Sequence, residues 1–539
     1  MTTSIQYSRR FTLAEAFQRA VAQFPNKEAL VFERRRWTYR QVDKAVQQIA
    51  LYLKSKGLKA GDHVAAYGAN SDAYVLYWLA CNRLGLVHVP VNYALLGDEL
   101  HYILTQSKAK AVFCDPHLKE SLANIQSRLD IGLYGTFFGG EQDDILSVAA
   151  VPPHEPATPG SVVLEDIRQF IENTLPMGDT DDVLLTAFNE KSPAQILYTS
   201  GTTSLPKGAM LSHEALYAEY MSAIEALDIK PSDKALTSLP LYHSAQMQVF
   251  LMPGLLQGVT QVIIPAPKPD VCFLWFEKEN ITTFFAPPTV WISLLRHPEF
   301  SVDKMKMLKK AYYGASIMPL PVLEEIRQLF PEMGVYNCYG QSEIGPLATV
   351  LNPAEHLISP ASAGRPVMNV MTRVVDDKMN TVPVGQVGEI VHQSKQLMSG
   401  YWDKPEQTEE SFEGGWFHSG DMGYFDEHGF LYIVDRIKDV INTGGVLVSS
   451  RDVEECLYKH PSVAEVAVIA IPDEKWVEAV CAVVTLKAGT TATEQELINF
   501  AKERIAPFKV PKKVHFKDEL PRNTAGKLLK RTLREEFAS

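Results

Sequence analysis

Segments with helical periodicity alternate with short apolar runs through most of the chain, and this alternation constrains the fold more than any other feature. Residues 12–24 and 39–56 carry apolar side chains at helical spacing, whereas residues 63–67 and 86–91 are short apolar runs typical of buried strands. Around helix-like segments such as 213–227, the pattern continues in strand-like runs at 236–241, 261–265 and 282–286. Such alternation predicts an α/β fold with parallel sheets covered by helices.

The pattern changes near residue 370. Short strand-like runs at 371–375, 388–391 and 430–434 are separated by turns that contain Gly and Asp, which indicates a small β-rich, barrel-like subdomain. A charged segment, 435–439, then leads into about a hundred residues of α+β pattern, a reasonable size for a small domain. We expect a large domain of two helix-covered sheets plus the subdomain at 1–434, a hinge at 435–439, and a small α+β domain at 440–539.

Composition excludes several classes of protein. With 539 residues the chain is too long for one ordinary domain, and its net charge of −12 argues against general nucleic-acid binding. No apolar run approaches the roughly 18 residues of a transmembrane segment, and the start shows no secretory signal. The six cysteines are widely spaced without a zinc pattern, as in a reducing compartment. We expect a cytoplasmic protein, with peripheral membrane contact and a homodimer left open.

Residues 198–208 read YTSGTTSLPKG and contain five Ser and Thr hydroxyls, two glycines and one lysine. Such a segment is too polar to build a core, but it can surround a polyanion with backbone N–H groups, hydroxyls and an ammonium. It is not the phosphate-binding loop G-x-x-x-x-G-K-[ST], because Lys207 precedes its glycine and no Ser or Thr follows that pair. A plain polar surface loop is the alternative, which the ordered end Pro206-Lys207-Gly208 disfavours.

Three further motifs follow in the chain: YGQSE at 339–343, HSGD at 418–421 and LPRNTAGK at 520–527. Taken singly, their charged residues are typical of solvated surface or of turn caps. Together and in this order they resemble the adenylate-forming enzymes, which include acyl-CoA synthetases, luciferases and nonribosomal adenylation domains. The resemblance covers nearly the whole chain and is strongest to the fatty acyl-CoA synthetases. Ser204 departs from the usual glycine of this family, and Ser342 replaces a threonine but keeps the hydroxyl.

The resemblance implies a site for ATP and for the AMP part of an adenylate. Glu343, with Thr199, would hold Mg²⁺, which prefers oxygen ligands. Tyr339 would stack on adenine, and Asp421 with Arg436 would bind the ribose hydroxyls. The full nucleotide set would be Thr199, Ser200, Gly201, Thr202, Thr203, Lys207, Gly314, Ala315, Ser316, Asn337, Tyr339, Gly340, Ser342, Asp421, Arg436, Lys438 and Lys527.

The resemblance also implies catalytic roles for Lys527, Glu343 and His243. Lys527 would bridge the attacking carboxylate and the α-phosphate, because its ammonium reduces the repulsion between two anions. His243 would lie between acyl pocket and thiol tunnel, although a lone histidine is more often structural. Gly444 and Gly445 would line the coenzyme A tunnel. Lys438 would be the pivot about which the mobile 440–539 domain swings, although a charged turn is equally consistent with a rigid connection.

These expectations combine into an AMP-forming acyl-CoA synthetase whose substrates are a carboxylic acid, ATP and coenzyme A. A medium- or long-chain fatty acid is the favoured acid. The apolar segments 284–288 and 290–292 suit an acyl pocket, and equally a plain core. Alternatives are a ligase for aryl or other carboxylic acids, an adenylation enzyme that loads a carrier protein, and a non-enzymatic nucleotide-binding descendant. Retention of Glu343, Asp421, Arg436 and Lys527 together disfavours the last.

Overall fold

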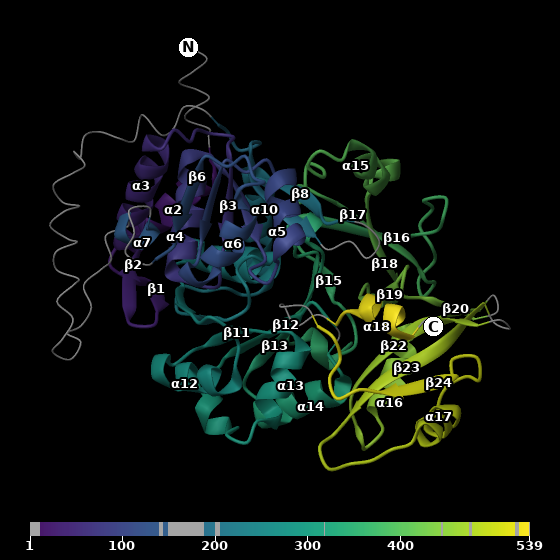
Figure 1. Ribbon diagram of the computed structural model, residues 1–539. Coiled ribbons are helices and arrows are strands. Elements are labelled where there is room, and N and C mark those ends of the chain that lie inside the picture. The colour runs from purple at the N-terminus through teal and green to yellow at the C-terminus, as the bar shows by residue number, and fades with distance from the viewer. Residues whose placement is uncertain are drawn as a thin grey trace.

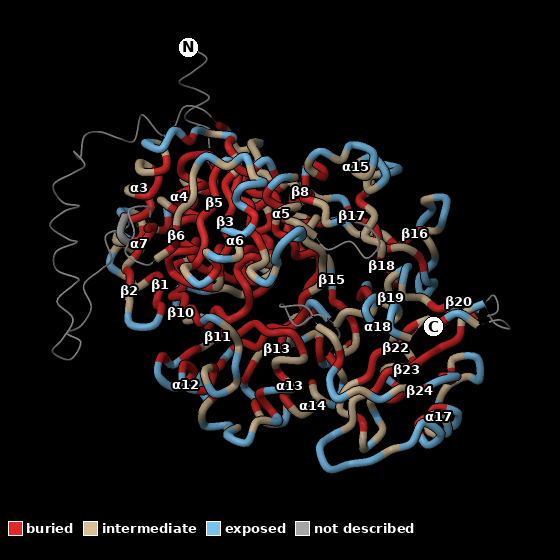
Figure 2. The backbone as a smooth tube through the Cα atoms, in the orientation of Figure 1, coloured by how far each residue is buried: buried red, intermediate tan, exposed pale blue. Residues whose placement is uncertain are grey.

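The computed structural model describes residues 11–138, 144–148, 188–199, 205–316, 318–443, 446–473, 477–522 and 528–537. A large lobe built on two sheets is followed by a small four-stranded sheet and then by a smaller lobe at the C-terminal end (Figure 1). The buried residues concentrate in the two large sheets and in the helices between them, as Figure 2 shows in red. The predicted α/β class is therefore confirmed.

The first sheet has six strands in the order β6-β5-β3-β4-β7-β8. Its pairs are parallel except that β7 and β8 run antiparallel, with Thr199 paired to Lys207. This hairpin places the two ends of the 198–208 loop side by side. The strands are β3 (His63–Tyr67), β4 (Val87–Val91), β5 (Ala111–Cys114), β6 (Leu133–Thr136), β7 (Pro193–Thr199) and β8 (Lys207–Ser212).

The second sheet has nine strands in the order β15-β14-β13-β12-β11-β9-β10-β1-β2. Its centre, from β13 to β1, is parallel, and β2, β14 and β15 are antiparallel additions at the two edges. The strands are β1 (Glu28–Phe32), β2 (Arg35–Thr38), β9 (Lys234–Thr237), β10 (Thr260–Ile263), β11 (Thr283–Phe285), β12 (Lys310–Gly314), β13 (Gly334–Tyr339), β14 (Thr349–Leu351) and β15 (Arg365–Pro366).

One layer of helices lies between the two sheets and contacts both. Helix α4 is buried along its whole length, because it packs against β4 on one side and β1 on the other. Capping boxes at Thr12 and Thr38 begin α2 and α3, which confirms the two predicted N-terminal helices. The layer comprises α2 (Leu13–Gln23), α3 (Tyr39–Ser55), α4 (Asp72–Leu84), α10 (His213–Ala226) and α11 (Met252–Gln257).

Other helices cover the two outer faces. Their apolar side chains join α5 and α6 to the six-stranded sheet, and α12, α13 and α14 to the nine-stranded sheet. Trp291 is buried against Phe284, among the side chains that join α12, α13 and α14 to the nine-stranded sheet. This part of the predicted acyl wall therefore belongs to the hydrophobic core. The outer helices are α5 (Gly97–Gln106), α6 (Lys119–Gln126), α12 (Pro269–Glu279), α13 (Pro288–Arg296) and α14 (Leu320–Leu329), whereas the short α7 (Ile145–Val148) packs against α3 and α4.

The predicted β-rich subdomain is a four-stranded antiparallel sheet in the order β16-β17-β18-β19. Among the described residues this sheet does not close into a barrel, because β16 and β19 remain its two edges and do not pair with each other. Helix α15 (Pro405–Ser411) packs against β18. The strands are β16 (Val370–Val375), β17 (Gly388–Ser394), β18 (Phe417–Phe425) and β19 (Leu431–Arg436).

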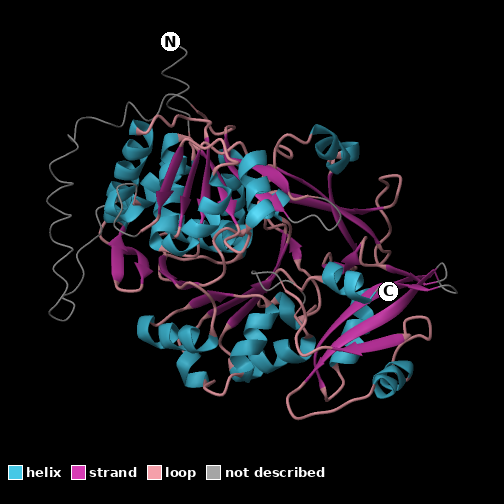
Figure 3. Cartoon of the chain, in the orientation of Figure 1, coloured by secondary structure: helices cyan, strands magenta, loops and turns pink. Residues whose placement is uncertain are grey.

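The C-terminal lobe has its own hydrophobic core, made only of residues from Ile441 onward. Its sheet order is β21-β20-β23-β22, with β24 added parallel to β23. The strands of this lobe are drawn in magenta at the lower right of Figure 3. Separate cores on either side of 435–439 fit the proposed domain boundary. The elements are β20 (Ile441–Thr443), β21 (Val446–Val448), α16 (Ser450–Tyr458), β22 (Val463–Asp473), β23 (Val477–Leu486), α17 (Glu494–Lys502), β24 (Lys513–Phe516) and α18 (Lys530–Phe537).

Candidate active site

Three strands from the two large sheets bring predicted site residues together at their carboxyl ends. Thr199 ends β7, Gly314 ends β12 and Tyr339 ends β13. Thr199 donates a hydrogen bond of 3.2 Å from Oγ1 to Oε1 of Glu343, so the two sheets meet at this point. Ligands of open α/β sheets bind outside the carboxyl ends of their strands.

Two of the predicted small residues are required by the backbone around them. A Cβ on Gly314 would lie 2.3 Å from the carbonyl oxygen of Cys338, and one on Gly340 would lie 1.9 Å from that of Pro346. Ala315, which follows Gly314, has a φ of 63°, a strained value for a residue with a side chain. The close approach of β12 to β13 therefore explains Gly314 without any ligand, and the close approach of residues 346–348 explains Gly340.

Glu343 lies in a single 3-10 turn, Ser342–Ile344, directly after β13. Its Oε1 accepts hydrogen bonds from Thr199 and, at 3.0 Å, from the hydroxyl of Tyr401. Burial and then the nearby Glu343 carboxylate raise the pKa of the Tyr401 phenol far above its usual value, so the phenol keeps its proton and donates.

The residues around Glu343 fit a magnesium ion. One carboxylate and a threonine hydroxyl are hard oxygen donors, and magnesium commonly takes one or two carboxylates with water and substrate phosphates in its other positions. Across the described ranges no group of three or more His, Cys, Asp or Glu side chains could hold a metal by itself. Magnesium at Glu343 would therefore need the phosphates of ATP as further ligands.

The buried carboxyl of Glu219, on α10, lies beneath the Glu343 turn. The side chain is fully buried, and a Cβ on Gly345 would lie 2.8 Å from its Cγ. Neither carboxyl oxygen has a hydrogen-bond partner among the residues that the structure describes. Burial raises the pKa of Glu219 well above its ordinary value of 4.5, so the group folds in its neutral form.

We expect Glu219→Gln to remove a pH-dependent loss of stability. The unfolded chain releases the Glu219 proton above about pH 4.5 while the folded protein retains it, so stability falls as pH rises toward the raised folded pKa. As pH rises, the free energy of unfolding of the variant should increase relative to that of wild type by up to about 1.4 kcal/mol per pH unit. Urea unfolding from pH 5 to 8 measures this, with exposed Glu225→Gln on the same helix as control. Parallel curves for Glu219→Gln and wild type would show that Glu219 is ionised in the fold.

Asp421 lies on β18 and contacts three other site residues. Its Oδ2 accepts from the Tyr339 hydroxyl at 2.7 Å and from Nε2 of Gln341 at 2.8 Å, and its Oδ1 lies 3.4 Å from Nε of Arg436. The HSGD residues form part of strand β18, which bends at Gly420, where φ is 70°. The predicted partners Asp421, Arg436 and Tyr339 are together.

Other predicted residues lie around this centre with their own contacts. The hydroxyl of Ser342 lies 2.9 Å from that of Ser244, the neighbour of half-buried His243, so the histidine segment adjoins the YGQSE motif. The side-chain amide of Asn337 donates to the carbonyl of Ser362. Two further cations lie nearby in the fold: Lys207, whose Nζ is 5.0 Å from the Tyr401 ring centroid, and exposed Lys438.

Several predicted residues lie outside the described part of the chain, and their roles remain predictions. They are Ser200, Gly201, Thr202, Thr203, Gly444, Gly445 and Lys527. Three residues with contacts at the site were missed by sequence reasoning: Gln341, Gln396 and Tyr401. Gln341 stands inside the YGQSE motif, which was the available signal. The other two belong to a segment with no recognised motif.

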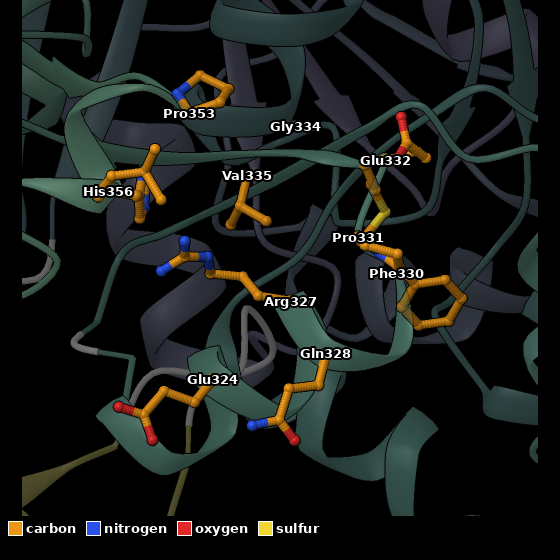
Figure 4. A pocket seen from close by; sticks show the side chains of 12 residues that line it. Glu324, Arg327, Gln328, Phe330, Pro331, Glu332, Gly334, Val335, Pro353 and His356 are labelled. Carbon is orange, nitrogen blue, oxygen red and sulfur yellow. The ribbon is translucent and has the colours of Figure 1, made fainter.

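A surface hollow of about 620 Å³ lies away from this centre (Figure 4). It is lined by α14, by Gly334 at the opposite end of β13 from Tyr339, and by residues around His356. None of the predicted site residues borders it.

The described helices include none that is both long and apolar enough to cross a membrane.

Comparisons with known proteins show the family to which this chain belongs. The model of the AMP-binding enzyme family matches residues 17–402, and that of the AMP-binding enzyme C-terminal domain matches residues 452–527. A feruloyl-CoA synthase from Amycolatopsis sp. is 33% identical over 93% of this chain and 94% of its own length. A long-chain-fatty-acid–CoA ligase from Bacillus subtilis is 30% identical over 97% of this chain and 94% of its own length.

The solved structures of MatB from Rhodopseudomonas palustris are 28% identical to this chain, and each comparison covers 98% of this chain and 99% of MatB. The TM-score is 0.85 for the ATP-bound form and 0.76 for the apo form. Sequence, both family models and the whole-chain fold thus agree, and the chain belongs to the AMP-binding enzyme family.

Proposed function

We propose that the protein is an AMP-forming ligase that joins a carboxylic acid to coenzyme A. The observation that carries this proposal is the meeting of Thr199 and Glu343 at the carboxyl ends of two sheets, next to the Asp421–Tyr339 pair. Whole-chain relatives that are CoA ligases support it. The magnesium bound at Glu343 would supply neutralisation of phosphate charge.

The reaction proceeds in two steps. A carboxylate oxygen of the acid attacks the α-phosphorus of ATP, the bond to pyrophosphate breaks, and an acyl-adenylate forms. The coenzyme A sulfur then attacks the acyl carbonyl carbon, its proton passes to solvent, and AMP leaves. In the first step Lys207 neutralises phosphate charge and Lys527 stabilises the α-phosphate as charge develops there. Asp421 and Arg436 hold the ribose.

Within this reaction class we favour a medium- or long-chain fatty acid as substrate. The long-chain-fatty-acid–CoA ligase of Bacillus subtilis supports this choice, while the feruloyl-CoA synthase supports an aryl acid as the second candidate. We assign a buried aromatic cluster to the wall of the acyl pocket: the Phe250 ring centroid lies 4.1 Å from that of Phe285 and 5.1 Å from that of Tyr312. Such a lining suits either acid.

A panel of fatty and aryl acids of graded length, assayed for pyrophosphate release with and without coenzyme A, tests the proposal. We expect release that depends on both the acid and ATP, and thioester only when coenzyme A is present. Strongest turnover with fatty acids supports the favoured substrate, and strongest turnover with aryl acids replaces it. Adenylate that accumulates without thioester formation would instead favour an enzyme that loads a carrier protein.

We also propose that the domain beyond 435–439 moves between the two steps. Residues Lys527, Gly444 and Gly445 all belong to that domain, yet they are assigned to different steps. The higher TM-score to ATP-bound than to apo MatB supports a resting orientation suited to adenylation.

Lys438→Pro should therefore spare adenylation and slow the thiol step. Proline fixes φ near about −65° at the proposed pivot, which restricts rotation away from the resting orientation. Single-turnover pyrophosphate release and thioester yield separate the two steps. Lys438→Ala, which removes the same charge without fixing φ, is the control. Normal thioester yield in Lys438→Pro would exclude this residue as the pivot.

A further inference from the structure

The side chain of Tyr401 lies between two charged groups of the proposed ATP site. Its hydroxyl is 3.0 Å from Oε1 of Glu343, and its ring centroid is 5.0 Å from the Nζ of Lys207. The residue is only 9% exposed. One buried side chain thus contacts both the carboxylate assigned to magnesium and the lysine assigned to phosphate.

The backbone on either side of Tyr401 is tied to the strand that carries Lys207. Tyr401 forms a bridge with Ala209, and Trp402 N donates to the carbonyl of Gly208 at 2.7 Å. Tyr401 N itself donates to Oγ1 of Thr408. The position of the ring relative to Lys207 is therefore set by main-chain hydrogen bonds to β8.

The same segment is also tied to the turn that carries Glu343. Met398 N donates to the carbonyl of Glu343 at 2.8 Å. Buried Gln396 donates from Nε2 to the carbonyls of Ile344, at 3.2 Å, and Leu347, at 2.9 Å. Residues 396–402 are therefore hydrogen-bonded both to β8, which carries Lys207, and to the turn that carries Glu343.

The chemistry of the contact fixes its direction. A tyrosine hydroxyl carries one proton, so at 3.0 Å it donates that proton to the Glu343 carboxylate oxygen, which accepts. Hydrogen bonds to a charged acceptor are stronger than neutral ones. Among the described residues both donors to Glu343, Thr199 and Tyr401, use Oε1. The other oxygen, Oε2, therefore accepts no side-chain hydrogen bond from the described residues.

We propose that Tyr401 is a positioning residue that couples Glu343 to Lys207. Its hydroxyl orients the carboxylate for magnesium, and its ring face holds the ammonium for the phosphates of ATP. This inference rests on the proposed function, because Glu343 and Lys207 are the groups assigned to magnesium and ATP. The measurement that depends on it is pyrophosphate release. The hydroxyl of Tyr401 acts on magnesium binding at Glu343, and its ring acts on ATP binding through Lys207. Separate substitutions can therefore test the two roles.

Tyr401→Phe tests the hydroxyl. The magnesium concentration for half-maximal pyrophosphate release should rise and the single-turnover rate should fall, each on the order of tenfold, as expected for a hydrogen bond to a charged group. Affinity for ATP in EDTA, measured by calorimetry, should change less than about twofold, because the ring still faces Lys207. The magnesium-dependent gain in ATP affinity should shrink in the same titration.

Tyr401→Leu tests the ring. Loss of the cation–π contact should also lower ATP affinity in EDTA, by about two- to fivefold. Trp402→Phe is the matched control: it removes a 3.0 Å hydrogen bond from Nε1 to the carbonyl of Gln106, on the same segment but away from Glu343 and Lys207. It should leave the magnesium dependence unchanged.

Two outcomes would overturn the proposal. Tyr401→Phe could show wild-type magnesium dependence, or Trp402→Phe could shift that dependence equally, which would indicate general loosening of the segment. If the wild-type protein released no pyrophosphate with any acid, the ligase proposal would fail. Calorimetric binding of ATP with and without magnesium would still decide the role of Tyr401.

Discussion

Replacing Lys527 with alanine is expected to stop adenylate formation while leaving the thiol step nearly intact. Negative charge develops at the α-phosphate only in the first transition state, and the Lys527 ammonium is the group assigned to stabilise it. Loss of one such preorganised donor commonly costs about a hundred- to a thousandfold in rate. Single-turnover pyrophosphate release measures the first step, and thioester formation from supplied acyl-AMP and coenzyme A measures the second.

Arg531→Ala is the matched control for Lys527→Ala. Arg531 lies four residues further along, is exposed, and pairs with Glu535 on the same helix. Its loss removes one positive charge from the same region of the small domain without touching the assigned site. Both steps should stay within about twofold of wild type, because exposed ion pairs contribute little. Equal losses in the two assays for Lys527→Ala would contradict the assignment of this lysine to the first step.

The fold was predictable from local patterns where each element carries its own periodicity. Helices α2 and α3 begin at Thr12 and Thr38 with capping boxes that are readable in the sequence. Strand β18 was not predicted because FHSGDMGYF contains two glycines and no regular alternation. Its strand conformation comes from pairing with β17 and β19, which are distant in the chain.

The site residues likewise fall into those that the sequence predicted and those that it did not. Motif residues such as Asp421 and Tyr339 were predictable because the family resemblance includes them, and the structure brings the pair within hydrogen-bonding distance. Tyr401 was not predictable, since its contact with Glu343 spans 58 residues and depends on how the segment after β17 packs on β8. The buried carboxyl of Glu219 was also missed, because the sequence of α10 does not reveal that position 219 lies on the buried side of the helix.

Glu343→Gln is expected to reduce activity by orders of magnitude at ordinary magnesium concentrations. Glutamine keeps the shape and can still accept hydrogen bonds from Thr199 and Tyr401 through its carbonyl oxygen. The substitution therefore removes the formal charge while it preserves the local packing. Without that charge the proposed metal ligand is weakened, and neutralisation of the phosphates at the transition state is lost.

Binding measurements separate this effect from misfolding. Affinity for ATP in EDTA should change far less than activity, and the thermal midpoint should stay near that of wild type. Glu325→Gln, which removes an exposed carboxylate paired with Arg296, is the control for loss of charge alone. If Glu343→Gln keeps both its activity and its magnesium dependence, Glu343 serves only to join β7 to the turn after β13. In that case the magnesium ligand must be sought elsewhere at the carboxyl ends of these strands.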